Sequence, residues 1–265
     1  MKFSGMLYKF RGQHWLVSQK IISKIIKSLN ISNDDIFLEI GAGIGNITGQ
    51  IVDRAKKVIA VELDYEHGIK MSKFTGRLSN IQPIIGDFLR LRIDELPDDV
   101  RIFGNIPYLI TNPIITKIMK EYTKYKDIHL TMQREVAIRV SSPGGSRDYG
   151  LLSVIVGLNN NVELIFDIPP KAFIPKPKVF STFIRITKKG KDWRPITDEF
   201  IEFVQLIFRY RRKTLINSIK LSFNKEDVDK ISKYLLESGF NEKIRIEDLS
   251  PETIYKLYKL KENEF

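Results

Sequence analysis

Residues 105–108, with the sequence Asn-Ile-Pro-Tyr, hold the groups best suited to chemistry on an aromatic amine. The exocyclic amine of adenine is a poor nucleophile because its lone pair is delocalised into the ring. The side-chain carbonyl of Asn105 and the backbone carbonyl of Ile106 can each accept one N–H and draw the nitrogen toward sp³ geometry. Pro107 stiffens this turn, and Tyr108 offers a face for an unstacked base. The alternative is a proline turn whose tyrosine is core.

Residues 37–48 predict a buried strand, a glycine turn and a helix. Their E-x-G-x-G-x-G spacing begins at Glu39 and includes Gly41 and Gly43, which allow a sharp turn and a close approach to a ligand. A dinucleotide fingerprint needs a glycine at position 46, where this chain has Asn46. The spacing is similar to motif I of the methyltransferases that depend on S-adenosylmethionine (SAM). A glycine turn without a ligand is the alternative.

Two carboxylates follow the next predicted strands. Glu62 ends the β-branched run 58–62, 21 residues after Gly41, and this spacing is typical of one βαβ unit. A carboxylate there can accept both hydroxyl protons of a ribose, which suits NAD and SAM equally. Asp87 follows the predicted strand 81–86 and can bind the exocyclic amine of a bound adenine. A solvated loop aspartate is the alternative.

The ordered set of motifs resembles the KsgA-type rRNA adenine N6-dimethyltransferases, in the archaeal or eukaryotic style. The resemblance covers nearly the whole chain and includes residues 12–16, 130–136, 149–153, 169–179 and 209–217. It implies SAM as the cofactor, adenosines of small-subunit rRNA as the substrate, and the immature small ribosomal subunit as the partner. It also implies cofactor contacts at His14, Leu16, Gly41, Gly43, Glu62, Asp87 and Asn105. The family usually has asparagine and phenylalanine where this chain has His14 and Trp15.

We expect the target base to be held and prepared by Asn105, Ile106, Pro107, Tyr108 and Phe173. Phe173 lies in a proline-rich loop, 169–178, which is expected over the active site. It either supplies the second face of a base clamp opposite Tyr108 or packs in the core.

The periodicity predicts an α/β fold. Apolar residues recur at helical spacing over 16–29, and strands are expected near 36–40, 58–62, 81–86, 101–105, 127–133, 162–168 and 179–186. This is the pattern of a Rossmann-like, seven-stranded SAM-dependent methyltransferase domain, in which an antiparallel hairpin closes an otherwise parallel sheet. We expect this domain, with its basic N-terminal arm, over residues 1–187.

A small helical domain is expected over residues 188–265. Helix start signals stand at Thr197, Asn224 and Ser250. A basic cluster in this part of the chain consists of Arg209, Arg211, Arg212 and Lys213. It either contacts rRNA phosphates or braces the interdomain surface, and we favour the RNA contact.

The composition limits the class of protein. A hydrophobic content of 43% and a charged content of 28% are ordinary for a globular protein. The chain has no cysteine and only three scattered histidines, so we expect no metal site. It contains no apolar run of transmembrane length and no signal-peptide pattern at Met1, so we expect a cytoplasmic protein without a membrane partner. We also expect a monomer.

The net charge of +11 favours a polyanionic partner. The first 33 residues contain no acidic residue, and their bases include Lys2, Lys9 and Arg11, with aromatic residues interleaved. This pattern suits contact with RNA phosphates beside base stacking. A solvated lysine-rich surface is the alternative, and the lack of acidic residues argues against it.

Three functional hypotheses follow. The first is an rRNA adenine dimethyltransferase of the small subunit, whose nearest rival is the antibiotic-resistance methyltransferase that modifies large-subunit rRNA. The second is a ribosome assembly factor on the same fold, with catalysis as a secondary task. The third is a NAD-dependent enzyme, which Asn46 and residues 105–108 disfavour.

A salt titration tests the N-terminal arm. Binding to rRNA is expected to weaken steeply with added salt, because lysine and arginine contacts release counterions. Replacing Lys2, Lys9 and Arg11 together by alanine is expected to flatten the log–log salt dependence. An unchanged slope in the triple variant would show that the arm does not touch phosphate.

Overall fold

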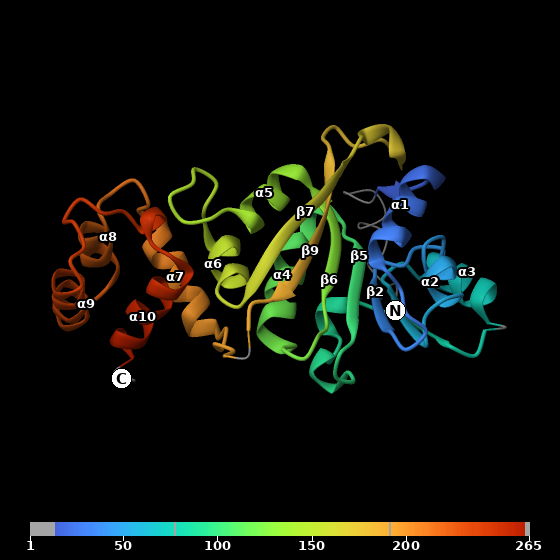
Figure 1. The fold of residues 1–265 in the computed structure, drawn as a ribbon, viewed down its shortest axis with the longest axis horizontal. Helices are drawn as coiled ribbons and strands as arrows, with labels where there is room; N and C mark the ends of the chain where they lie inside the picture. The colour runs from blue at the N-terminus through green and yellow to red at the C-terminus, as the bar shows by residue number, and fades with distance from the viewer. Residues whose placement is uncertain (1–13, 77, 191, 263–265) are drawn as a thin grey trace, which may run out of the picture. The chain divides into compact units, whose positions relative to one another are not determined.

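The structure is a computed structural model that describes residues 14–76, 78–190 and 192–262. It forms two compact units (Figure 1). The N-terminal unit contains the chain up to Ala137 together with Val162–Lys188, and the C-terminal unit contains Ile138–Asn161 and the chain from Lys189. The last change between units lies close to the predicted boundary at 187/188. The segment Ile138–Asn161, however, packs with the C-terminal helices.

The N-terminal unit is built on a seven-stranded sheet with the order β4-β3-β2-β5-β6-β9-β7. The strands are β2 (Ile36–Ile40), β3 (Lys57–Glu62), β4 (Ile81–Ile85), β5 (Arg101–Asn105), β6 (Ile128–Gln133), β7 (Asn160–Ile168) and β9 (Ser181–Lys188). The first five in the spatial order run parallel, and β9 pairs with β6 antiparallel. The predicted fold class is confirmed.

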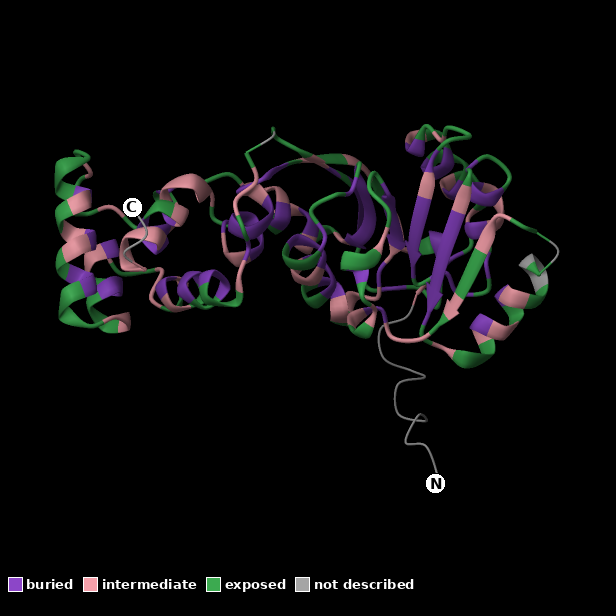
Figure 2. Cartoon of the chain, turned by 90° about the horizontal axis from the view of Figure 1, so that it is seen from below, coloured by how far each residue is buried: buried purple, intermediate pink, exposed green. Residues whose placement is uncertain are grey.

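Helices of the N-terminal unit cover the sheet. They are α1 (Gln19–Leu29), α2 (Thr48–Val52), α3 (Tyr65–Thr75) and α4 (Thr111–Glu121), and α5 (Arg134–Ser141) leads into the C-terminal unit. The apolar stripe of α1 is fully buried in one core cluster with Phe37, Phe103 and Phe183 of the sheet. Figure 2 shows how the buried residues concentrate in the central strands. These strands are apolar on both faces because both faces are covered.

Helix α4 follows the turn at residues 105–108 without a break. Thr111 is its first residue, because the 3₁₀ turn Tyr108–Ile110 runs directly into α4. The Thr111 hydroxyl donates to the carbonyl of Pro107, at 3.3 Å. The start of α4 is therefore joined directly to the turn that carries the candidate catalytic residues.

A two-residue strand, β1 (Trp15–Leu16), pairs antiparallel with β8 (Phe173–Ile174). Val17 adds a backbone hydrogen bond to the carbonyl of Ala172, at 2.9 Å. These contacts join the segment before α1 to the proline-rich loop, although the two are far apart in the chain. Neither strand was predicted, since two residues carry no readable alternation.

The described part of the C-terminal unit contains α6 (Leu151–Gly157), α7 (Asp198–Arg209), α8 (Leu215–Ser222), α9 (Lys225–Glu237) and α10 (Pro251–Lys261). The side chains of Thr197, Asn224 and Ser250 cap α7, α9 and α10, as predicted. Over the ranges that the structure describes, no helix is long and apolar enough to span a membrane.

A buried charge cluster lies at the amino-terminal ends of β2, β5 and β6. Arg101, which is 4% exposed, donates to both carboxylate oxygens of Asp127 (2.8 and 2.9 Å) and to Asp35 (2.7 Å). It also donates to the carbonyls of Leu29 and Asn30 at the end of α1, at 2.6 and 3.3 Å. One guanidinium therefore ties the end of α1 to three neighbouring parts of the sheet.

The carboxyl groups of this cluster are kept ionised. Burial raises the pKa of Asp127, but His129 and Arg101 lower it more, so the net pKa is well below its ordinary range. The pKa of Asp35 is lowered in the same way, because Lys126, Ser32 and Arg101 outweigh its burial. Groups with a lowered pKa stabilise the fold above about pH 4, and the stabilisation is lost as the pH falls below that value.

Replacing Arg101 by methionine tests this cluster. The variant is expected to lose about 3–5 kcal/mol of unfolding free energy at pH 7, because the buried carboxylates lose their partner. Its stability is also expected to fall less than that of the wild type as the pH drops from about 4 toward 2. Arg101→Lys, which keeps the charge, is expected to be intermediate. Urea unfolding at several pH values measures this, and a Met variant as stable as the wild type would contradict it.

Candidate active site

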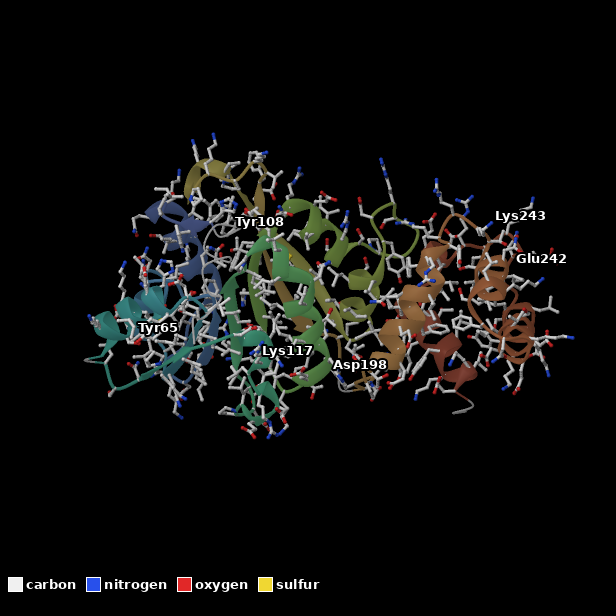
Figure 3. The ribbon with its side chains drawn as sticks, turned by 180° about the vertical axis from the view of Figure 1, so that it is seen from behind. Tyr65, Tyr108, Lys117, Asp198, Glu242 and Lys243 are labelled. Carbon is white, nitrogen blue, oxygen red and sulfur yellow. The ribbon has the colours of Figure 1, made fainter. Side chains whose placement is uncertain are left out.

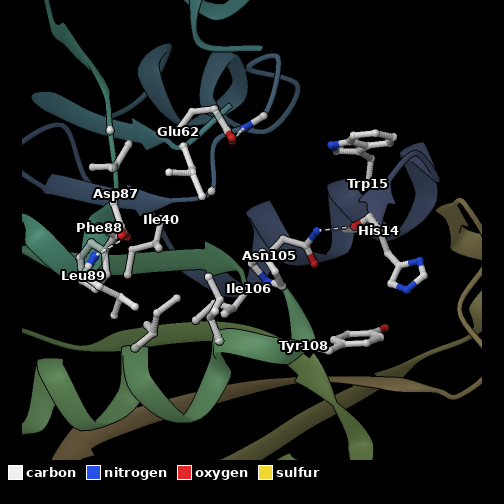
Figure 4. Close-up of a pocket in the computed structure, with 18 residues that line it drawn as sticks. His14, Trp15, Ile40, Glu62, Asp87, Phe88, Leu89, Asn105, Ile106 and Tyr108 are labelled. Carbon is white, nitrogen blue, oxygen red and sulfur yellow. Dashed lines mark hydrogen bonds between the residues drawn. The ribbon is translucent and has the colours of Figure 1, made fainter. Parts of the chain in front are cut away.

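An open cavity lies at the carboxyl edge of the parallel strands in the N-terminal unit (Figure 4). The register sets Ile40 beside Val61 and Gly104, so β2, β3 and β5 end at the same edge. The residues that line the cavity include His14, Gly41, Gly43, Glu62, Asp87, Asn105, Ile106, Pro107 and Tyr108. Nine of the predicted site residues therefore lie around one space.

The glycine turn forms one wall of the cavity. Gly41 and Gly43 have positive φ values of 75° and 61°, which glycine adopts without strain. The N–H groups of Gly41 and Ala42 donate to the carbonyl of Val61, at 2.9 and 3.1 Å. These bonds hold the turn against β3, so a ligand meets a backbone whose shape is already set.

The Glu62 carboxylate is fixed by two backbone donors. It accepts from the N–H of Gly43 at 2.7 Å and from the N–H of Asp64 at 2.8 Å. Glu62 is only 5% exposed, yet it lines the cavity. Each oxygen has a second lone pair, so the carboxylate can accept from a ribose diol while its backbone bonds are kept.

Glu39 has a different character. It is 2% exposed and does not line the cavity. Burial raises its pKa to about 8, and the charge of Glu62 adds to this, while Thr48 lowers it. Glu39 is therefore mostly neutral at pH 7. It lies inside the unit, at the end of the strand that leads into the glycine turn.

Asp87 lies on the same cavity wall as several apolar side chains. Its Oδ1 accepts from the N–H of Leu89 at 2.9 Å, which orients the carboxylate. Ile40, Val61 and Phe88 line the cavity nearby. Together they offer an apolar slot with one acceptor, which suits a purine ring and its amine. None of these three apolar residues was predicted, since buried apolar residues of a strand (Ile40, Val61) or of a 3₁₀ turn (Phe88) are indistinguishable from core in the sequence.

The Asn105 side chain at the cavity is oriented by a hydrogen bond to the backbone. Its amide nitrogen donates to the carbonyl of His14 at 2.9 Å, and its oxygen points toward the side on which Tyr108 lies (Figure 4). The preceding residue must be small, because a Cβ on Gly104 would meet the carbonyl of Ile40 at 2.9 Å. The amide is therefore set as an acceptor before any substrate arrives.

The turn after Asn105 is held from two sides. The N–H of Ile106 donates to the carbonyl of Thr131 on β6, at 3.1 Å. The Tyr108 hydroxyl bonds to Ser181 Oγ at 2.7 Å. Burial raises the pKa of Tyr108 above its ordinary value, although Ser181 lowers it, so the ring stays neutral. Tyr108 is thus a fixed, uncharged aromatic surface.

Leu16 and Phe173 are placed differently from the other predicted site residues. Their side chains are 4% and 3% exposed, and both belong to the core cluster that α1 covers. Neither lines the cavity. The clamp predicted for Phe173 is therefore corrected to core packing, because pairing of β8 with β1 turns its ring into the sheet core. The cofactor contact predicted for Leu16 is not made by its side chain.

The basic cluster of the C-terminal unit has two parts. Arg211 donates to Glu247 at 2.7 Å and to the carbonyl of Arg147 at 2.8 Å, so it braces two loops. Arg209, Arg212 and Lys213 are exposed. In the same unit, Glu242 and Lys243 project outward (Figure 3). Lys2, Lys9 and Arg11 lie outside the described residues.

Comparison with known proteins identifies the family. The sequence pattern of the family described as ribosomal RNA adenine dimethylase matches residues 7–263. The chain belongs to the ribosomal RNA adenine dimethylase family. The predicted family and enzyme class are therefore confirmed, and with them the use of SAM.

Individual relatives agree with this assignment. The chain is 34% identical to the ribosomal RNA small subunit methyltransferase A of Alkaliphilus oremlandii over 261 residues, which cover 95% of this chain and 90% of the relative. The protein of the same name from Halothermothrix orenii is also 34% identical, over 94% of this chain and 86% of the relative.

Two solved structures resemble the fold. A dimethyladenosine transferase from Plasmodium falciparum aligns with a TM-score of 0.77 and 25% identity, over 92% of this chain and 96% of that one. The 23S rRNA methyltransferase ErmE aligns with a TM-score of 0.68 and 22% identity, over 94% and 99%. The second likeness concerns the fold alone.

Glu62→Ala tests the assignment of the cofactor site. The variant is expected to bind SAM about 1.5–3 kcal/mol more weakly, the scale of hydrogen bonds lost to a charged group. Asp64→Ala is the matched control, because Asp64 caps α3 and does not line the cavity. Calorimetry that gives the wild-type SAM affinity for a folded Glu62→Ala protein would remove Glu62 from the site.

Proposed function

We propose that this protein transfers methyl groups from SAM to the N6 amine of adenosines in small-subunit rRNA, during the biogenesis of the ribosome. Two adjacent adenosines, each methylated twice, are the proposed substrate. The names of the relatives from Alkaliphilus oremlandii and Halothermothrix orenii support the small subunit. The membership of the chain in the ribosomal RNA adenine dimethylase family supports adenine as the base.

The orientation of Asn105 is the observation that carries this proposal. Its amide nitrogen is occupied by the His14 carbonyl, so the oxygen is the atom presented to a ligand. An acceptor at this position suits an amine that must lose its planarity. It offers nothing to the unprotonated ring nitrogens of adenine, which are themselves acceptors.

The residues of the cavity divide into two groups. Glu62 would bind the ribose of SAM, Asp87 its adenine amine, and the turn at Gly41 and Gly43 its amino-acid part. When bound, SAM supplies a methyl group on a sulfonium, which carries its own leaving group. These residues do no more than hold the cofactor in place.

The second group prepares the nucleophile. At the first methylation, Asn105 Oδ1 and the carbonyl of Ile106 would each accept one N–H of the target amine, which localises the nitrogen lone pair for attack on the methyl group. The methylated nitrogen would then release one proton to water, which leaves one N–H for these acceptors at the second methylation. Pro107 keeps both acceptors in place, so no reorganisation is needed during the reaction. Tyr108 supports the face of the unstacked base.

The basic residues are assigned to the rRNA. We place phosphate contacts at Lys2, Lys9, Arg11, Arg209, Arg212 and Lys213, while Arg211 braces the C-terminal unit. Arg209, Arg212 and Lys213 support this because their exposed side chains are available to phosphates. We further propose that the protein acts as a monomer in the cytoplasm, on the immature small subunit.

Asn105→Ala and Tyr108→Ala test the mechanism. The first is expected to lower kcat by on the order of 10²-fold or more, because one preorganised polar contact is lost. The second is expected to weaken retention of the target adenosine as well as turnover, since a stacking face is worth about 1–3 kcal/mol. Transfer of labelled methyl groups from SAM to precursor small subunits, with mapping of the modified base, measures both effects.

Binding of the subunit is the control in this experiment. Neither variant is expected to lose it, because it depends on the basic surfaces. Near-normal dimethylation by Asn105→Ala would refute the mechanism. Label found only in large-subunit rRNA would refute the proposed substrate. Normal ribosome maturation in cells that carry the inactive variant would favour the assembly-factor hypothesis for the main biological role.

A further inference from the structure

The side chain of His14 occupies the surface on which a target base is expected to lie. Its ring centroid is 5.1 Å from that of Tyr108, with 38° between the ring planes. Figure 4 shows the imidazole on the same side of the tyrosine ring as Asn105, displaced toward the hydroxyl end of that ring. The Nδ1–H group donates to the carbonyl of Pro175, at 2.6 Å. The ring is thus held in place by one hydrogen bond and one aromatic contact.

This distance leaves no room for a base between the two rings. A purine between them would need centroids about 7 Å apart, twice the carbon–carbon contact distance of ~3.5 Å. His14 therefore does not form the second wall of a clamp in this position. A base that stacks on this face of Tyr108 must replace the imidazole.

The backbone of His14 is held much more firmly than its ring. Its carbonyl accepts from Asn105, and the next residue, Trp15, pairs with Ile174 in the β1–β8 strand pair. Among the described residues, rotation of the His14 side chain breaks the ring contact to Tyr108 and the hydrogen bond to Pro175. The ring can therefore leave while the bond that orients Asn105 remains.

We propose that the imidazole of His14 is a stand-in for the target base: the imidazole lies on Tyr108 in the free enzyme, and an adenosine displaces it. This inference deepens the proposed function and rests on it. His14 is a positioning residue: its backbone orients Asn105, and its ring keeps Tyr108 covered in the free enzyme.

The displacement lowers the affinity for every base by the same amount, so the discrimination between bases comes from the contacts of the amine. Any base can stack on Tyr108, but each must first give up the energy of the His14 contact. An adenine recovers it, because its amine also donates to Asn105 and Ile106. A base without an amine at that position has no such compensation, so it is retained less well.

A fluorescent base tests the stand-in. The probe is a short unstructured RNA that carries one 2-aminopurine, which is quenched when it stacks and has no N6 amine. His14→Ala and His14→Asn are expected to bind it about two- to tenfold more tightly than the wild type, the scale of one aromatic contact. The gain is expected to vanish in a Tyr108→Ala background, as a double-mutant cycle requires.

His67→Ala is the matched control, because the His67 ring packs on Trp15, with 5.2 Å between the ring centroids, and not on Tyr108. It is expected to leave the binding of the probe unchanged. Weaker or equal binding by both His14 variants, with wild-type circular dichroism, would overturn the proposal. So would a gain that persists without Tyr108.

Methyl transfer by the wild type, measured separately on small subunits, distinguishes the two claims. If the wild type fails to methylate, the proposed function fails, whatever the probe shows. If it methylates and the His14 variants do not bind the probe more tightly, only the stand-in fails.

Discussion

The hydrogen bond from the Asn105 amide to the His14 carbonyl is the contact on which the site depends. An amide side chain can present either a donor or an acceptor to a ligand, and the two choices suit different substrates. The carbonyl of His14 accepts one N–H of the amide nitrogen, at 2.9 Å, and so holds the nitrogen on the side away from Tyr108. What remains toward the cavity is an oxygen in a fixed position. The acceptance of an amine is thus decided by a backbone atom 91 residues away in the chain.

That contact in turn requires both partners to be held. Asn105 ends β5, where Gly104 lets the strand approach β2 closely, and the bond from Ile106 to Thr131 fixes the following turn. His14 is held through the β1–β8 pair. At the opposite edge of the sheet, Arg101 joins the end of α1 to the strands. The chemistry lies at one edge of the sheet, and the buried charges stabilise the other.

The sequence was sufficient for the parts of the site that lie on strand ends. Glu62, Asp87 and Asn105 follow apolar runs, and the carboxyl ends of parallel strands meet at one edge, so their meeting could be predicted. The glycine spacing likewise predicted the turn at Gly41 and Gly43, which the structure forms with positive φ values. The apolar periodicity predicted the seven strands, and the helix start signals predicted the caps of α7, α9 and α10.

The remaining features depend on contacts that leave no periodic signal. A two-residue pairing decides that Phe173 is core and that the ring of His14 reaches Tyr108. The apolar wall at Val61 and Phe88 consists of residue types that are found in any buried core. The brace between Arg211 and Glu247 joins loops 36 residues apart, so a basic cluster alone did not reveal it. Each of these features is set by contacts between segments distant in the chain, and the local sequence is compatible with more than one outcome.

The single-turnover methylation rate of Asn105→Asp on small subunits tests most directly whether the hydrogen bond from Asn105 to His14 prepares the site. This variant keeps an oxygen toward the substrate but sets a second oxygen against the His14 carbonyl, so the orienting bond is lost. If the bond to His14 is what prepares the site, the rate is expected to fall on the order of 10²-fold, nearly as far as in Asn105→Ala. A rate within about threefold of the wild type would show that the oxygen suffices without the hydrogen bond to His14, and would contradict this mechanism.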